Sequence, residues 1–334
     1  MEVRKIYVTG GSTFVVSLPK KWVESQDLKA GDSVFLTQTG KSIIIEPGIR
    51  EEKKIKEKKI RISMLPSPSS LERLIIAYYL TGYDTISIIL DREDKESYRR
   101  AARRIKEFLI GVEIVEDTTK RITMEILVDH QRMPVLKAIQ RIHLLCKSML
   151  HDLIEAMNVG CSYSVEEIQT SEKEVDRLYF LVVRQLKSAV TQYKIAEKLE
   201  IKSPDHCLGY RSIVKSMERI SDHLDNIAKY YSDICKYGNE LLLKDGIISL
   251  GRKVTEIYEK SMLSLFKRDP LSTEEVFNKL DSINREYSEL SDSLFKSKAS
   301  ISLVLCEKSI IESLERIARY SSDICEIVIN MYVK

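Results

Sequence analysis

The spacing of apolar residues changes along the chain, and the pattern in the first segment predicts strands. Up to about residue 48, short β-branched runs such as VRKIYV, TFVVSL and KSIIIEP are bounded by turns that contain glycine. The run LPKKWVESQ interrupts them and carries Pro19 where a first helical turn tolerates proline. This segment is therefore expected to form four short strands and one short helix.

Between residues 59 and 129, strand and helix patterns alternate. Strands are predicted over 59–65, 85–91, 112–117 and 121–128, and helices over 69–81 and 94–109. Such alternation is typical of a small layer of helices on a sheet. The middle of the chain is therefore expected to be a small α/β domain.

From residue 133 to the end, apolar residues recur at intervals of three and four, which indicates amphipathic helices. Breaks at Gly160, Pro204, Gly238, Pro270 and Ala299 divide this region into six long helices. Long helices joined by short turns pack as antiparallel bundles.

An internal repeat divides the six helices into two groups of three. The stretch RSIVKSMERISDHLDNIAKYY from Arg211 aligns without gaps on KSIIESLERIARYSSDICEIV from Lys308. Each stretch is the third helix of its half. The expected domains are therefore residues 1–48, 49–130, 131–238 and 239–334, the last two being three-helix bundles.

Composition adds few constraints. With 334 residues, 43% of them hydrophobic, the chain has enough apolar side chains for a sizeable buried core. Its net charge of only +3 is too small to indicate by itself that the protein binds nucleic acid. The start of the chain lacks the apolar core of a signal peptide, and no run approaches the length of a membrane span. We expect a cytoplasmic protein without membrane insertion. The six cysteines are scattered singly, which favours buried thiols in a reducing cytosol, although disulfides are possible in a hyperthermophile.

Paired carboxylates are the strongest candidate chemistry. The stretch SMERISDHLDNIAKYYSD places Glu218 and Asp222 four residues apart, where like charges on one helical face repel each other. The preceding helix carries Glu172 and Asp176 at the same spacing. If the two pairs converge in a bundle, a bound cation would remove both their repulsion and their desolvation penalty. Oxygen ligands suit magnesium, manganese or iron, and zinc also accepts carboxylates.

Neighbouring polar residues leave two alternatives open. His223 or Asn226 could add a ligand or orient one. Conversely, the acids could simply form a solvated face, with Arg219 and Arg177 as ion-pair partners.

The stretch MERISDHLDNIA resembles the signature of the PhoU family of phosphate-signalling proteins. The helices of that family carry paired E-x-x-x-D motifs that bind multinuclear metal clusters, and two tandem three-helix bundles are similar to its fold. The resemblance covers residues 134–334. It implies Glu172, Asp176, Glu218 and Asp222 as metal ligands.

The second half departs from this pattern. Arg319 stands where Asp222 stands in the first half, and the partner helix places Asn284 and Leu280 opposite Asp176 and Glu172. An arginine would repel a cation and could instead satisfy Glu315. We therefore predict one site for iron, manganese, magnesium or zinc, in the first bundle only.

The first 48 residues resemble the AbrB/SpoVT swapped-hairpin DNA-binding domain, through VVSLPKKW, LKAGDSV and GKSIIIEP. So short a segment makes a marginal core alone, and the resemblance implies a homodimer whose strands interlock. Its basic and hydroxyl side chains could neutralise or donate to phosphates, although isolated lysines also serve only solubility. The same fold also serves as a toxin-binding antitoxin or an oligomerisation device. The candidate DNA-binding residues are Arg4, Lys5, Ser12, Thr13, Lys20 and Lys21.

Together these features predict a fusion of archaeal type: a swapped-hairpin β domain, a small α/β domain without an assigned role, and all-α tandem three-helix bundles. We expect a phosphate-responsive transcriptional regulator of phosphate uptake that is not an enzyme. One alternative is an adaptor that does not bind DNA and docks a phosphate transporter ATPase or a signalling protein. A metal-dependent hydrolase is disfavoured, because the sequence contains no G-x-S-x-G, P-loop or H-E-x-x-H motif.

Overall fold

The computed structural model divides the chain into two compact units, Met1–Ile55 and Lys56–Lys334. It describes the following residues: 2–39, 42–48, 55–128, 132–161, 165–191, 193–201, 203–238 and 240–333. The division falls at residue 55 alone, so the domain boundaries expected at residues 48, 130 and 238 stay predictions.

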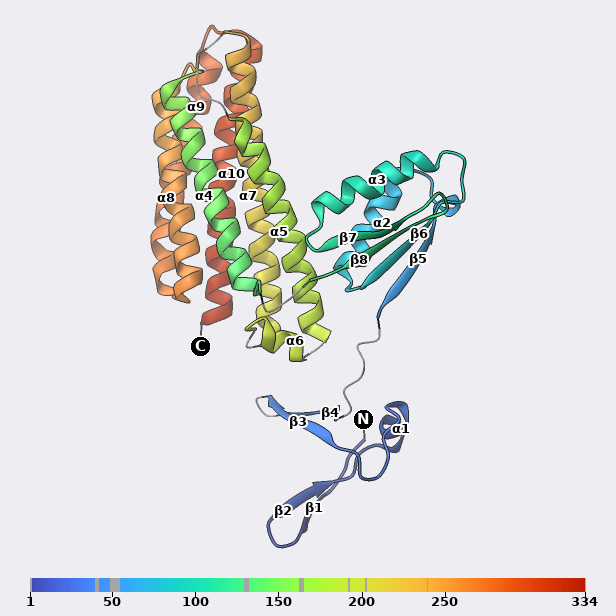
Figure 1. Cartoon of the computed structure of the whole chain (residues 1–334). Helices are drawn as coiled ribbons and strands as arrows, with labels where there is room; N and C mark the ends of the chain where they lie inside the picture. The colour runs from blue at the N-terminus through green and yellow to red at the C-terminus, as the bar shows by residue number, and fades with distance from the viewer. Residues whose placement is uncertain are drawn as a thin grey trace. The chain divides into compact units, whose positions relative to one another are not determined.

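The first unit contains two antiparallel hairpins and one short helix (Figure 1). In the first hairpin Ile6 pairs with Val16 and Thr9 with Thr13, and the turn places Gly10 and Gly11 at positive φ, which glycine adopts at little cost. The predicted strands and helix of this segment are confirmed. The elements are β1 (Ile6–Thr9), β2 (Thr13–Val16), α1 (Lys20–Ser25), β3 (Val34–Thr39) and β4 (Ser42–Pro47).

This unit has no core of its own, because none of its described residues is buried. Phe14 is 73% exposed, and Leu36 and Ile43 are each 66% exposed. Isolated two-stranded hairpins are marginally stable in water. The described residues of this unit therefore do not cover its apolar strand faces.

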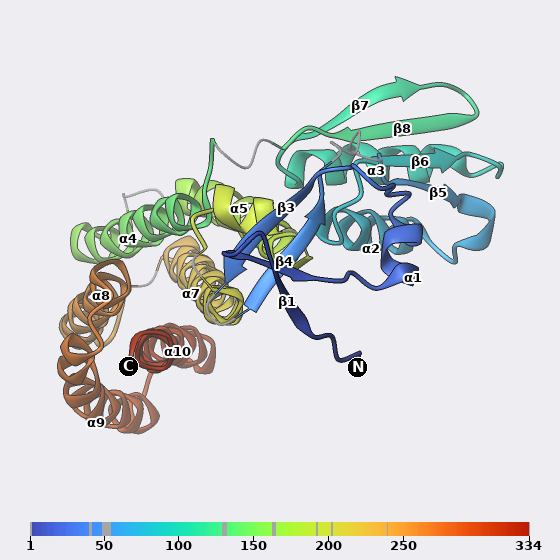
Figure 2. The same ribbon diagram turned by 90° about the horizontal axis from the view of Figure 1, so that it is seen from below.

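The second unit begins with a four-stranded sheet in the order β5-β6-β8-β7, in which only β5 and β6 are parallel. Both helices lie on one face of the sheet (Figure 2). Their apolar side chains pack against it, and Tyr79 and Tyr98 are fully buried there. The predicted alternation is confirmed, although a 3-10 turn over Ile62–Met64 ends the first strand early. The elements are β5 (Glu57–Arg61), α2 (Pro68–Leu80), β6 (Thr85–Ile89), α3 (Lys95–Phe108), β7 (Val112–Asp117) and β8 (Arg121–Ile126).

The remainder of the second unit is helical, and the six predicted long helices are confirmed. A short helix, α6 (Tyr193–Lys198), lies between the second and third and was not predicted. The long helices are α4 (Val135–Val159), α5 (Glu166–Thr191), α7 (Pro204–Lys236), α8 (Lys244–Lys267), α9 (Glu274–Lys296) and α10 (Ile301–Tyr332).

The two three-helix groups share one continuous apolar core. The first group is α4, α5 and α7, and the second is α8, α9 and α10. Figure 2 views these helices from one end: α7 packs along α10, and α4 packs along α8. Burial of this joint core is the main source of stability for helices of such length, since isolated helices are marginal in water.

A buried arginine joins the α/β layer to the bundle. Arg184 of α5 is 5% exposed, donates a hydrogen bond to the backbone oxygen of Tyr79, and lies 5.0 Å from the centroid of that tyrosine ring. The charge is thus held against a carbonyl and an aromatic face, which are both favourable partners for a guanidinium.

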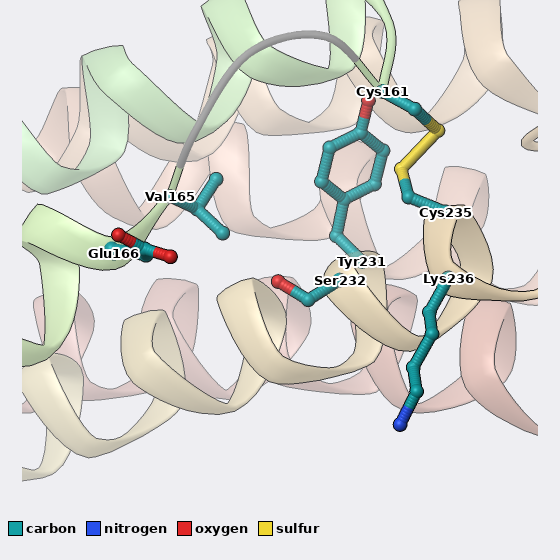
Figure 3. A pocket seen from close by; sticks show the side chains of 7 residues that line it. All are labelled: Cys161, Val165, Glu166, Tyr231, Ser232, Cys235 and Lys236. Atoms are coloured by element: carbon teal, nitrogen blue, oxygen red, sulfur yellow. A yellow bond between two sulfur atoms is a disulfide. The ribbon is translucent and has the colours of Figure 1, made fainter.

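One disulfide corrects the expectation that all cysteines are reduced thiols. Cys161, just after α4, is bonded to Cys235 near the end of α7, with their Cα atoms 5.3 Å apart (Figure 3). The pairing joins residues 74 positions apart, which spacing along the chain cannot reveal. Cys146, Cys207 and Cys325 are buried free thiols, as predicted.

A helix with the length and apolar character that a bilayer span requires is absent from the described residues.

Candidate metal centre

Three carboxylates from two packed helices converge in the first bundle. Glu172 and Asp176 lie on α5, Asp222 lies on α7, and one oxygen from each lies within 4.8 Å of the others. All three residues are half-buried. The four-residue spacing on α5 places its two acids on the face that meets α7.

Burial and mutual repulsion make these acids hard to ionise. Burial, with the charges of Glu172 and Glu218 next in importance, raises the pKa of Asp176 from its ordinary value of 3.8 to about 7. Burial and Glu218 raise the pKa of Asp222, while burial and Asp225 raise that of Glu172. A cation bound between the acids would reverse these shifts, because opposite charge favours the ionised carboxylate.

Glu218, the fourth expected ligand, is not part of this cluster. Its two carboxylate oxygens lie 2.6 and 2.5 Å from the ammonium nitrogen of Lys215, one turn earlier on α7. Arg219, one of the two expected ion-pair partners of these acids, has its guanidinium farther away, at 3.9 Å from Glu218. The structure therefore groups three of the four carboxylates and pairs the fourth with a lysine.

Asp225 lies near the carboxylate cluster and was not among the expected ligands. One of its oxygens pairs with Lys229, and the other is buried without a hydrogen-bond partner among the described residues. Its charge also raises the pKa values of Glu172 and Asp222. It lies three residues after Asp222, so a search for any acid at i+3 or i+4 would have found it.

His223 and Asn226 were expected to add or orient a ligand. The Nδ1 atom of His223 lies 3.3 Å from the hydroxyl of Ser313, and its ring stacks near Tyr320, both on α10. The structure thus turns His223 away from the carboxylates. Asn226 is half-buried one turn beyond Asp222.

The donor set fits a hard metal ion. Every clustered donor is a carboxylate oxygen, which magnesium, manganese and iron prefer and zinc accepts. One oxygen of Asp225 is buried without a hydrogen-bond partner among the described residues, and the pKa of Asp176 is raised. Both features indicate an excess of negative charge that a cation would balance. Glu172, Asp176 and Asp222 would hold the ion, which would supply that charge.

The second bundle neutralises its own carboxylate. Arg319 forms an ion pair with Glu315, one turn earlier on α10, which confirms that the arginine satisfies this acid. Asn284 carries a buried amide oxygen without a partner among the described residues, and Leu280 packs against the core. None of these three positions offers a carboxylate to a cation.

The candidate DNA-binding residues are all exposed, and the first unit separates them into two groups. Arg4 and Lys5 precede β1, while Lys20 and Lys21 begin α1, near the open end of the first hairpin (Figure 1). Ser12 and Thr13 lie at the hairpin tip. At about 3.4 Å per residue, the tip is roughly 10 Å from the open end. One protomer therefore gathers the four basic residues but not the two hydroxyl residues.

The fold is that of tandem three-helix bundles, with the carboxylate cluster in the first bundle and with an α/β layer and a hairpin unit earlier in the chain. A model of the PhoU domain matches residues 139–231 and 247–328, together more than half of the chain, and the chain belongs to this family. The two matched segments coincide with the two helical repeats.

Two further comparisons bear on the parts of the chain. Residues 7–54 match the family described as antidote-toxin recognition MazE, bacterial antitoxin. The crystal structure of PhoU from Pseudomonas aeruginosa is similar in fold, with a TM-score of 0.51 and 18% identity over 59% of this chain and 94% of that chain. No curated protein matches in a sequence search.

Proposed function

We propose that the protein is a homodimeric, phosphate-responsive transcriptional regulator that controls phosphate uptake in the cytoplasm. The observation that carries the proposal is that one chain joins a PhoU bundle to a hairpin unit with bare apolar strand faces. PhoU domains belong to phosphate signalling, and hairpin units of this type bind DNA as dimers. The proposal includes no catalytic step.

Dimerisation follows from the exposure of the hairpin strands. Side chains such as Phe14 and Leu36 would remain in water in a monomer, and contiguous exposed apolar surface marks an interaction site. A second copy of the same hairpins is the partner that covers both sets of strands at once. Two copies also present two basic ends to DNA, which raises affinity through multivalency.

The carboxylate cluster supplies the sensor. A metal ion held by Glu172, Asp176 and Asp222 stabilises the first bundle and gives the regulator two states, with and without the ion. Only a ligand with different affinity for two conformations can change DNA binding.

DNA binding is tested by gel shifts with the promoter region of the protein's own gene. Arg4→Ala with Lys21→Ala should weaken retention, because it removes two phosphate contacts from each protomer. The matched control is Arg252→Ala with Arg285→Ala, which removes the same charge from exposed positions on α8 and α9. Equal retention of the two double variants would refute DNA binding through the first unit.

One observation favours a second function, an adaptor that docks a transporter ATPase or a signalling protein without binding DNA. Arg4 pairs with Glu2, and Lys20 lies 3.6 Å from Glu24, so part of the basic charge is already neutralised. A wild-type dimer that shows no DNA retention at any salt concentration would support this alternative.

A further inference from the structure

A second site lies beside the carboxylate cluster, where α7 meets α10. It is a pocket of about 560 Å³, within the size range of small-molecule sites. Every charged side chain on its wall is a cation, and the others carry hydroxyl groups. The lining residues are Arg211, Ser212, Lys215, Ser216, Arg219 and Tyr320.

The cations form a ladder on one face of α7. Arg211, Lys215 and Arg219 follow each other at four-residue intervals, where like charges destabilise a helix. With a rise of 1.5 Å per residue, the ladder spans about 12 Å. Glu218 pairs with the middle cation of this row, Lys215. An anion in the pocket would compensate the charge that remains on Arg211 and Arg219.

An aromatic ring on α5 orients the first two cations. Arg211 donates a hydrogen bond of 2.8 Å to the hydroxyl of Tyr179, and its guanidinium lies 5.1 Å from the centroid of that ring. The ammonium of Lys215 lies 5.2 Å from the same centroid. Within the described part of the chain, Arg211 has no carboxylate at ion-pair distance.

The two acids near the pocket compensate only part of the charge of its three cations. Glu218 pairs closely with Lys215 but is 3.9 Å from Arg219, and Asp222 is 4.0 Å from Arg219. The side chain of Arg219 is 51% exposed. Two guanidinium groups at the ends of the ladder are thus available to a ligand.

Hydroxyl groups complete the wall. Ser212 and Ser216 lie one turn apart beside the ladder, and Tyr320 faces them from α10. The guanidinium of Arg316 lies 5.9 Å from the centroid of the Tyr320 ring. Guanidinium groups bind phosphate oxygens through paired hydrogen bonds, and hydroxyl groups donate to the remaining oxygens.

We propose that this pocket binds an elongated anion with several phosphate groups, either inorganic polyphosphate or a nucleoside polyphosphate. The length of the ladder exceeds a single phosphate group, so a chain of phosphates uses all three cations at once. The inference rests on the proposed function only in assigning this ligand the role of effector. Binding itself follows from the pocket.

Titration calorimetry on the full-length protein tests the proposal, with inorganic triphosphate, orthophosphate and ATP as ligands. EDTA is present throughout, so that no metal at the carboxylate cluster can bridge to phosphate. Triphosphate should bind about tenfold or more tightly than orthophosphate, because it meets more charged donors. If ATP and triphosphate bind with equal affinity, the pocket recognises only the phosphate chain. If ATP binds more tightly than triphosphate, the pocket recognises a nucleotide.

Two double variants separate the pocket from general charge. Arg211→Ala with Arg219→Ala should weaken triphosphate binding about tenfold or more, since both ends of the ladder are lost. Arg252→Ala with Arg285→Ala, and Arg4→Ala with Lys21→Ala, should leave it nearly unchanged. Equal weakening in all three double variants, or none in the first, would overturn the proposal.

A single variant covers the case in which the first double variant does not fold. Ser212→Glu keeps all three cations and places a carboxylate at an exposed position on the pocket wall. It should weaken triphosphate binding, and unchanged binding would refute the pocket. None of these measurements contains DNA, so a failure of the anion site is distinct from a failure of the proposed regulator.

Discussion

Arg319 pairs with Glu315 on α10, four residues apart along the same helix. The glutamate side chain is only 8% exposed, whereas the arginine is 54% exposed. The pair therefore gives a buried carboxylate a cationic partner from the protein itself. In the first bundle Asp222 takes the place of the arginine, and the same helical position contributes to the carboxylate cluster instead.

Removing the guanidinium should destabilise the protein. Arg319→Ala leaves the Glu315 carboxylate buried and unpaired, which should cost roughly 1–2 kcal/mol of unfolding free energy, reduced from the fully buried case because water reaches the arginine side. Urea unfolding followed by circular dichroism measures the loss. Arg252→Ala, an exposed arginine on α8, serves as the control and should change little.

The raised pKa of Asp176 predicts a pH-dependent stability in the absence of metal. The folded state holds this proton up to about pH 7, while the unfolded chain releases it near pH 4. The folded state therefore binds more protons between these values, and stability falls as the pH rises through that window. Partial exposure limits the loss to roughly 1–2 kcal/mol.

Asp176→Asn should flatten this dependence. It removes the titrating group and makes the protein in EDTA more stable than wild type at pH 8, although both should be alike near pH 4. Melting temperatures across this pH range provide the measurement. A variant that is less stable than wild type at pH 8 would contradict the repulsion among the acids.

Metal binding should occur once per chain. Manganese at about a hundred times its dissociation constant should stabilise the wild type by about 2.7 kcal/mol, since the ion binds only the folded state. Glu172→Gln with Asp222→Asn should abolish both this shift and the bound metal in elemental analysis. Glu315→Gln, at the position of the second bundle that corresponds to Glu218, should retain the metal. Loss of metal in the Glu315 variant would place the site elsewhere.

The dimer interface is predicted to lie in the first unit. Phe14→Asp with Leu36→Asp places charges on two strand faces that a partner would cover, and should convert the dimer to a monomer in light scattering. The helical signal in circular dichroism should persist, because the bundle has its own core. A helical protein that remains dimeric would move the interface to the second unit.

Sequence was most informative where the cause of structure is local. The periodicity that defines α7 and α10, and the glycine turn at residues 10 and 11, predicted these elements because each depends on nearby residues. The internal repeat also predicted the Glu315 and Arg319 pair, since both lie on one helix. The six long helices followed from the same rule.

The pairing of side chains within the bundle was harder to predict from the sequence. Glu218 could join the neighbouring carboxylates or pair with Lys215, and only the folded structure shows that it pairs with Lys215. The link between Cys161 and Cys235 depends on where two distant helix ends meet. Asp225 was not predicted as a ligand because it lies three residues after Asp222 and outside the E-x-x-x-D pairs.

The Lys215 and Glu218 pair lies next to both the carboxylate cluster and the proposed anion pocket, and its removal should alter anion affinity. Glu218→Gln deletes the carboxylate that occupies the Lys215 ammonium and also lies 3.9 Å from Arg219. The Lys215 ammonium then becomes available to phosphate and Arg219 loses a nearby acid. Triphosphate in EDTA should therefore bind about three- to tenfold more tightly, in keeping with the modest strength of ion pairs near a protein surface.

Lys215→Ala provides the opposite change and should weaken binding. Calorimetry on both variants and on wild type gives the comparison. If Glu218→Gln leaves the affinity unchanged while Lys215→Ala lowers it, the lysine already contacts the anion without leaving its glutamate. In that case a metal ion that attracts Glu218 could not release Lys215 to the pocket, and the two sites would bind their ligands independently.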